Sequence, residues 1–243
     1  MININMKPEY IFSVAKVDIT NTLFTSFLVT IFLTVFSVLF FISYKNKKYK
    51  INIFFKVIIL ELVKLIDKVT SDKKLTDMVL PLIATFFIFI ISANLLALFP
   101  GFLGSFFIQV DHKSIPLLRS PNSDLTTTLA LAIFSVVFIQ IFSLKILGVK
   151  KFILRFVNLT NPIKFILGVF ELISELVRIL SFSFRLYGNI FAGEVLLLII
   201  TYLSPYLFPL PFMVLEIFVG TIQAFIFAML TLAFISAGIA NKK

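Results

Sequence analysis

The sequence contains no cysteine, no tryptophan and a single histidine, His112. Without cysteine the chain has no disulfide framework, no thiol chemistry and no cysteine-ligated metal, and one histidine cannot build a histidine metal cluster. Only 14% of the residues are charged, whereas an average soluble domain has about 25%. We therefore expect no metal and no other cofactor, and the composition excludes an ordinary soluble globular protein.

Apolar residues dominate what is present. They make up 60% of the 243 residues, and the formal net charge is +10; the mean hydropathy is +1.08. In a soluble protein such an excess of Lys and Arg would suggest nucleic acid. Here it predicts membrane topology, because basic residues gather in the loops on one side of a bilayer. We expect a lipid bilayer and no nucleic acid as partner.

Three apolar segments long enough to cross a bilayer precede the last hundred residues. They cover 23–44, 79–99 and 125–148, and the first contains no charge. A cleaved signal peptide is the competing interpretation of 23–44, but no basic region directly precedes it and no small-residue cleavage site follows it. Residues 1–22 are then an outer N-terminal segment, and 100–124 form a polar outer loop.

The segment 51–74 has a different pattern. Its charged residues fall mostly at three- and four-residue spacing, as on one face of a helix, and include Lys56, Glu61 and Lys64. This spacing predicts an amphipathic helix that lies in the interface on the inner side of the membrane. A solvated helix packed on a partner subunit is the alternative that the pattern leaves open.

The last hundred residues predict a long helical hairpin over 163–240. No proline interrupts 163–203, so this segment can form one helix about 60 Å long, roughly twice the hydrocarbon thickness. Such a helix must be tilted, kinked or partly outside the membrane. A final helix follows at about 212–240, after a turn at Pro205, Pro209 and Pro211. The predicted fold class is an all-α polytopic membrane protein with about five membrane-crossing helices.

The basic residues predict the orientation of these crossings. With the N-terminus outside, sixteen of the 22 Lys and Arg residues lie on the inner side and four on the outer side. This bias agrees with the positive-inside rule, so we expect the N-terminus outside and the C-terminus inside.

Six ionisable residues lie where hydrocarbon is expected, and each costs about 2.5–3.5 kcal/mol at the centre of a span. A helix lying on the surface, with these residues solvated or snorkelling, is the structural alternative. Most of them belong to one polar stripe with helical spacing, which also includes Ser181 and Asn189. The six are Glu171, Glu175, Arg178, Arg185, Glu194 and Glu216.

The midpoints of the two helices predict the depth of these residues. Arg185 lies near mid-membrane, and Gln223 lies at the same depth on the returning helix, where it can approach Arg185. Carboxylates lie toward both sides: Glu171 and Glu175 toward the inside, Glu194 and Glu216 toward the outside. Because a guanidinium stays protonated and repels cations, this pattern predicts two wet half-channels separated by Arg185. A partner must carry the ion between them.

The motifs resemble subunit a of the F-type rotary ATP synthases. The segment from Ser181 to Glu194 (SFSFRLYGNIFAGE) is similar to the arginine block of that family, and Gln223-Ala-Phe-Ile-Phe is similar to its last helix. Weaker similarities lie at Asn94 to Pro100 and at Pro121 to Thr128. The resemblance covers nearly the whole chain in order, length and number of spans.

The resemblance implies roles for matching residues. Arg185 would face the ring of c subunits, with Gln223 as its polar partner and Asn189 nearby. Glu194 and Glu216 would belong to the outer half-channel and Glu171 to the inner one, where the polar stripe also places Glu175. Supporting positions would be Asn94, Asp124, Ser181 and Arg178. The implied partners are the c-ring, the peripheral-stalk b subunits and other ATP synthase subunits.

Three positions depart from the family pattern: Ile179 replaces a common proline, Ala97 replaces an acidic residue of some bacterial members, and Thr126 replaces a common asparagine. The resemblance implies proton transport coupled to ATP synthesis, with the bacterial plasma membrane as the expected location and the mitochondrial inner membrane as the alternative. Sodium is also compatible with these residues. A self-contained ion transporter or channel and a structural anchor subunit remain alternatives. No phosphate-binding glycine-rich loop is present, so we expect no catalytic site on this chain.

Overall fold

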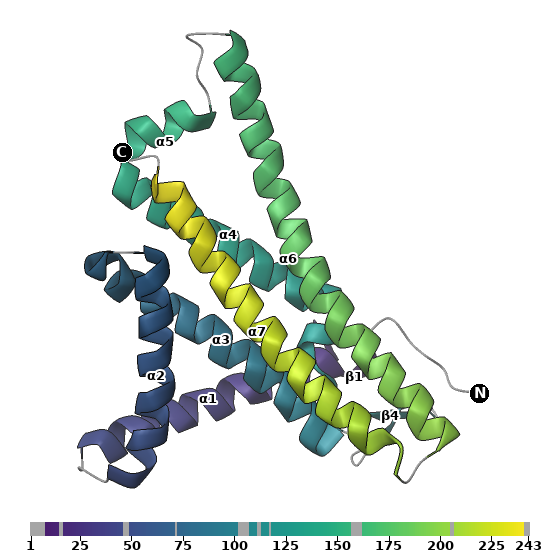
Figure 1. Cartoon of the computed structure of the whole chain (residues 1–243). Coiled ribbons are helices and arrows are strands. Elements are labelled where there is room, and N and C mark those ends of the chain that lie inside the picture. The colour runs from purple at the N-terminus through teal and green to yellow at the C-terminus, as the bar shows by residue number, and fades with distance from the viewer. Residues whose placement is uncertain are drawn as a thin grey trace.

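A computed structural model describes residues 8–14, 17–45, 49–70, 72–101, 107–110, 113–116, 118–156, 162–204 and 207–240 (Figure 1). Seven α-helices make up most of this part of the chain. They are α1 (Asn21–Lys45), α2 (Tyr49–Thr70), α3 (Lys73–Gly101), α4 (Leu125–Leu147), α5 (Val149–Phe156), α6 (Pro162–Leu203) and α7 (Pro209–Ala240).

The expected fold class is confirmed: the chain is an all-α polytopic membrane protein. Four helices, α1, α3, α4 and α7, are long and apolar enough to cross a membrane. The long helix α6, which carries most of the charges expected within the membrane, is not one of these four. A fifth crossing by α6 therefore stays a prediction.

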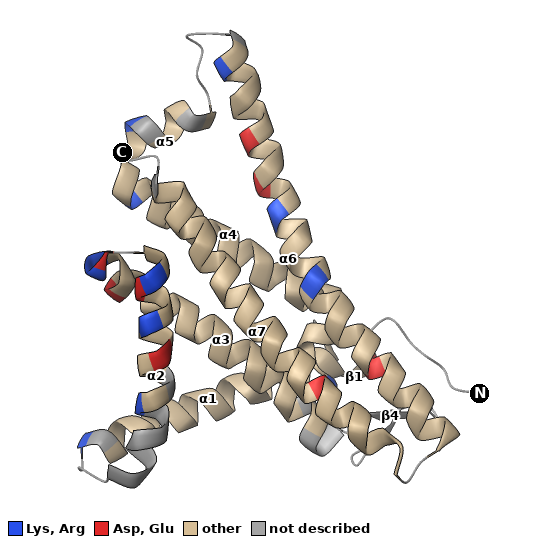
Figure 2. Cartoon of the chain, viewed as in Figure 1, with Lys and Arg blue, Asp and Glu red and all other residues tan. Residues whose placement is uncertain are grey.

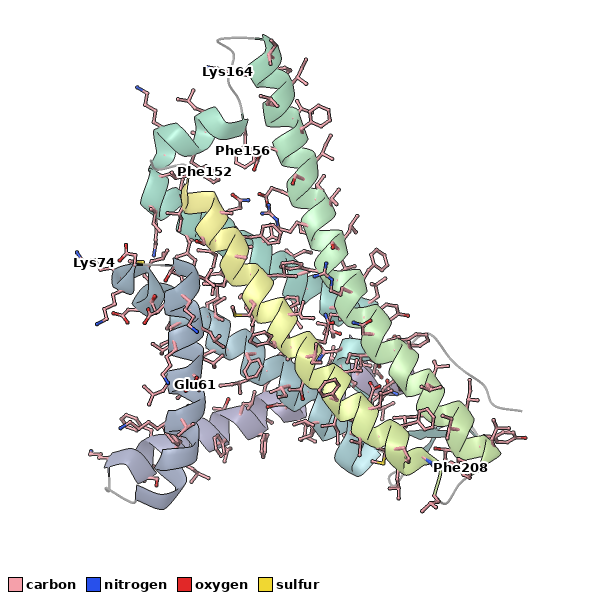
Figure 3. All side chains as sticks on the ribbon, viewed as in Figure 1. Glu61, Lys74, Phe152, Phe156, Lys164 and Phe208 are labelled. Atoms are coloured by element: carbon pink, nitrogen blue, oxygen red, sulfur yellow. The ribbon has the colours of Figure 1, made fainter. Side chains whose placement is uncertain are left out.

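The hairpin of α6 and α7 runs along one side of the molecule (Figure 1). Helix α6 has 42 residues and α7 has 32, and Lys164 and Phe208 lie at opposite ends of the structure (Figure 3). Helix α7 begins at Pro209, so the expected turn at Pro209 and Pro211 is wrong. Proline fits the first helical turn, where its missing N–H would have no partner. Pro205, also expected in this turn, lies outside the described residues, as does His112.

The amphipathic segment expected over 51–74 is divided between two helices. Helix α2 ends at Thr70, and Asp72 caps the next helix by accepting the backbone N–H of Lys74 at 2.9 Å. Lys56, Glu61 and Lys64 are exposed, whereas Ile66 is buried in the core. Helix α2 therefore has the charged face that its spacing predicts, and its position at the membrane interface stays a prediction.

Two short antiparallel hairpins and the short helix α5 were not expected from the sequence. The strand segments are rich in β-branched and aromatic residues, which favour extended backbone, and a 3-10 turn, η2 (Pro121–Ser123), follows them before α4. Gly148, with φ +79°, ends α4 in a conformation that glycine adopts at no steric cost, and α5 begins directly afterwards. The strands are β1 (Tyr10–Val14) with β2 (Val17–Thr20), and β3 (Phe107–Val110) with β4 (Lys113–Pro116).

The core that positions the long hairpin lies between α3, α4, α6 and α7. Phe227 of α7 is almost fully buried there, with its ring centroid 5.5 Å from that of Phe86 on α3 and 5.2 Å from that of Phe182 on α6. Ser135 of α4 and Thr231 of α7 share a hydrogen bond of 2.8 Å within this layer. Aromatic packing and a buried hydroxyl pair thus fix α6 and α7 against the rest of the bundle.

We predict that Phe227→Ala destabilises the chain, because it opens a cavity where three helices meet. The expected loss is about 3–5 kcal/mol in the free energy of unfolding, measured by thermal unfolding of the purified chain in detergent. Phe218→Ala is the matched control, since Phe218 lies on the same helix and is 62% exposed. Equal melting temperatures for the two variants would contradict the core assignment.

Candidate functional site

Arg185 lies on the exposed face of α6. One of its Nη atoms donates a hydrogen bond to the Ser181 hydroxyl at 3.4 Å, one turn earlier on the same helix. Within the described residues the guanidinium has no carboxylate partner. Ser181 and Asn189 lie on the same polar stripe as Arg185, and exposed apolar side chains flank this stripe, among them Val177, Leu180 and Phe184. The structure therefore presents an exposed cation on a polar stripe with apolar side chains beside it.

The amide of Gln223 lies between α7 and α6 and is 2% exposed. Its Oε1 accepts a hydrogen bond from Asn189 Nδ2 at 2.7 Å. Gln223 was expected to approach Arg185, but in the described part of the chain no hydrogen bond joins the two. Asn189 stands one helical turn beyond Arg185, so the amide pair lies beside the cation and links the two long helices at that depth.

Two carboxylates of the long hairpin lie near each other toward the end that holds the α6–α7 connection. Glu194 of α6 is an ion-pair partner of Arg119, with Nε and Oε1 2.9 Å apart. Glu216 of α7 is 7% exposed. A Cβ atom added to Gly193 would meet the Glu216 carboxylate, so the absence of a side chain at Gly193 lets Glu216 approach α6.

Arg119 was missed as a site residue by the sequence interpretation, which counted it only among the charges of the outer loop. The guanidinium is 8% exposed, and its Nε also donates to the Ser123 hydroxyl at 3.2 Å. The only sequence signal was its place five residues before Asp124 in a polar segment. That signal was weak, because the contact with Glu194 spans two distant parts of the chain.

Asn94 of α3 connects the 118–124 segment to α7. Its Nδ2 donates to the Gly220 carbonyl at 3.2 Å, and its Oδ1 accepts from Asn122 Nδ2 at 2.7 Å. Asp124 accepts the backbone N–H of Thr126 at 2.9 Å and the hydroxyl of Thr22 at 3.2 Å. Asn94 and Asp124 therefore act as structural anchors of the polar cluster in this geometry.

The opposite half of α6 carries a second arginine–carboxylate pair. Two Arg178–Glu175 hydrogen bonds are 2.9 and 2.7 Å long, and both side chains are 11% exposed. The Arg178 guanidinium also lies over the Phe234 ring of α7, 4.0 Å from its centroid. A solvated surface position, the alternative raised from the sequence, does not fit these two residues. Glu171, one turn earlier, is half-buried.

The positions that depart from the expected pattern leave the local structure regular. Helix α6 is unbroken through Ile179, which packs against the buried cluster around Phe182. Thr126 uses its backbone N–H at the cap of α4. The side chain of Ala97 lies outside the described part of the structure.

Charges are thus distributed along α6 in a fixed order (Figure 2). A buried carboxylate–arginine pair lies in the first half of α6, the exposed Arg185 lies near its middle, and Glu194 lies toward its far end, where Glu216 of α7 approaches the same helix. Carboxylates exchange protons, whereas the guanidinium between them does not titrate at physiological pH. This arrangement offers two separate sets of acid–base groups on either side of a permanent cation.

The chain is similar to known proteins. The chain matches the family model described as ATP synthase A chain over residues 23–236. A protein named ATP synthase subunit a from Moorella thermoacetica is 39% identical over 157 residues, which are 65% of this chain and 63% of that protein. A protein of the same name from Syntrophobacter fumaroxidans is 35% identical over 189 residues, 77% of this chain and 71% of that protein.

A third relative, from Desulforamulus reducens and also named ATP synthase subunit a, is 38% identical over 177 residues, 70% of this chain and 60% of that protein. The matches thus span less than two thirds of the length of the Moorella and Desulforamulus proteins. The family match itself covers most of the present sequence and includes α6 and nearly all of α7. The chain belongs to the ATP synthase A chain family.

Proposed function

We propose that this chain is the membrane stator subunit of an F-type ATP synthase. It conducts protons through two offset half-channels to and from the c-ring, and so couples ion flow to rotation and ATP synthesis. The observation that carries this proposal is the exposed Arg185, placed along the long hairpin between two sets of carboxylates. Family membership and the four apolar helices support it.

Arg185 faces the c-ring in this proposal. A guanidinium at the centre of a bilayer costs about 2.5–3.5 kcal/mol on insertion scales, and this one has no carboxylate partner among the described residues. A carboxylate on the passing ring supplies the missing counter-charge. The apolar side chains around Arg185, such as Leu180 and Phe184, are exposed and provide the surface along which the ring slides.

Protons enter through the outer half-channel at Glu194 and Glu216. Both side chains lie toward the end of the hairpin that holds the α6–α7 connection, where Arg119 of the 118–124 segment pairs with Glu194. From there a proton passes to the ring carboxylate. The protonated carboxyl tolerates lipid, because burial penalises the charged form.

The proton leaves through the inner half-channel near Glu171 and Glu175, after the ring has turned almost one full revolution. Arg185 prevents a direct passage between the two sets of carboxylates, because a fixed positive charge repels a proton in transit. Each elementary charge that crosses 100 mV supplies about 2.3 kcal/mol, so several protons are combined for each ATP. ATP hydrolysis drives the same path in reverse.

The location of the charges supports an orientation with the N-terminus outside and the C-terminus inside. Figure 2 shows Lys and Arg on α2, at the start of α3 and in the region of α5, besides those on α6. Basic residues favour the inner face. We place the protein in the bacterial plasma membrane, in contact with the c-ring and the b subunits of the peripheral stalk; the mitochondrial inner membrane is the alternative location.

We predict that Arg185→Ala abolishes ATP-driven proton pumping by the reconstituted ATP synthase and introduces a passive proton leak. The reason is that the variant has no cation to hold the ring carboxylate or to separate the half-channels. Proton uptake into proteoliposomes measures both effects. Lys164→Ala is the matched control, because Lys164 is an exposed cation on the same helix, and it should pump normally.

Unchanged pumping by Arg185→Ala would contradict the proposed function. A self-contained transporter or channel predicts proton flux through the purified chain alone in liposomes. The stator proposal predicts no such flux without the ring, so this measurement separates the two functions.

The orientation is tested with introduced cysteines, because the natural chain has none. We expect Lys74→Cys to react with a membrane-impermeant maleimide only from the inner side, and Leu207→Cys only from the outer side. Both positions are exposed. Labelling of right-side-out and inside-out vesicles measures this, and the reverse pattern would rule out the proposed orientation.

A further inference from the structure

We infer that Arg119 is a positioning residue of the outer half-channel: it holds Glu194 as a fixed, paired carboxylate, so that Glu216 is the carboxyl that exchanges protons with the ring. This inference rests on the proposed function and divides the work between the two outer carboxylates. In the simpler account the two carboxylates are equivalent relays.

The geometry around Arg119 holds its guanidinium in one place. Its Nε lies 2.9 Å from Glu194 Oε1 and 3.2 Å from the Ser123 hydroxyl. Its backbone N–H donates to the Thr25 hydroxyl of α1 at 3.2 Å. The outer segment, α1 and α6 therefore meet at this one residue, and an arginine held by its backbone and its side chain has little freedom to leave its partner.

Glu216 differs from Glu194 although the two lie close together. In the described part of the chain Glu216 forms no ion pair, and it is buried beside Gly193, the residue directly before Glu194. A carboxyl without an ion-pair partner binds and releases a proton without breaking a charge–charge contact. Glu194 must first separate from a guanidinium that always stays protonated. Proton exchange is therefore easier at Glu216.

The charge balance of the outer cluster leads to the same assignment. Arg119 and Glu194 carry opposite charges, so the pair has no net charge beside Glu216. Removing Glu194 leaves the buried Arg119 without its counter-charge, and removing Arg119 leaves the partly buried Glu194 without one. Either single loss is more disruptive than removing both partners. Glu194 is then needed to compensate the charge of Arg119. Together the two residues hold the 118–124 segment against the outer half-channel.

Four variants of the reconstituted ATP synthase test this division. They are Arg119→Gln, Glu194→Gln, the double variant with both changes, and Glu216→Gln, and the readout is ATP-driven pumping per assembled complex. We expect each single change in the pair to lower pumping at least about tenfold, and the double variant to recover to within about threefold of the parent. Glu216→Gln should abolish pumping, since it removes the exchanging carboxyl.

The control is an exposed cation–carboxylate pair outside the path. Lys64 and Glu61 form an exposed pair of 2.7 Å on α2. Their single and double glutamine variants should pump like the parent, because exposed pairs contribute little. Pumping by the Arg119/Glu194 double variant as low as that of Glu216→Gln would overturn the inference, and so would normal pumping by Glu216→Gln.

Infrared difference spectra give a readout that a purely structural role of Arg119 would not change. In the parent background, Glu194→Gln should remove an ionised carboxylate band, because Arg119 keeps Glu194 ionised. In the Arg119→Gln background, the same change should instead remove a protonated carboxyl band. Loss of the same ionised band in both backgrounds would contradict the fixed-pair assignment.

Arg119→Lys keeps the assignment testable if the neutral variants assemble poorly. The lysine retains the positive charge, so pumping should stay within about threefold of the parent; a loss as large as that of Arg119→Gln would contradict the role of the charge. The Arg185→Ala result separates the two levels. If that variant pumps normally, the proposed function fails, whereas failure only at Arg119 and Glu194 leaves the function intact.

Discussion

An ionised side chain within a bilayer needs a counter-charge from its own chain, water, or a counter-charge from a partner subunit, because hydrocarbon does not stabilise a charge. Along α6 each of these solutions is present or implied. Arg178 and Glu175 compensate each other within α6, and Arg119 of the 118–124 segment pairs with Glu194. Arg185, near the middle of the helix, is exposed and has no carboxylate partner among the described residues. That contrast is the strongest reason to expect a ring carboxylate at this position.

The length of α6 follows from the same constraint. A helix of 42 residues is far longer than a perpendicular crossing requires, but it can present groups at several depths along one face. Helix α7 returns beside it and contributes the second carboxylate, Glu216, and the amide Gln223. The glycine at 193 allows this close approach, since an added side chain would meet the Glu216 carboxylate. Both the packing of α6 on α7 and the proposed proton chemistry therefore require the two helices to lie close together at Gly193.

Much of this could be predicted from the sequence, because helical spacing and hydropathy are local properties. The stripe from Glu171 to Asn189 and the apolar spans need only the helical period. The start of α7 at Pro209, the helix α5 after Gly148 and the two strand hairpins depend on finer local preferences that hydropathy does not encode. The Arg119–Glu194 contact depends on how a loop folds back over a helix 75 residues later, and no local pattern predicts it.

The two arginine–carboxylate pairs differ in how the structure holds their partners together. Arg178 and Glu175 lie on the same helix three residues apart and stay together wherever α6 moves. Arg119 and Glu194 join separate segments, so their contact depends on the 118–124 segment remaining docked on the bundle. Ser123 and Thr25 provide that docking through hydrogen bonds to the same arginine. The outer half-channel is therefore the part of the proposed path whose electrostatics depend on tertiary structure, and the inner half is built mainly into one helix.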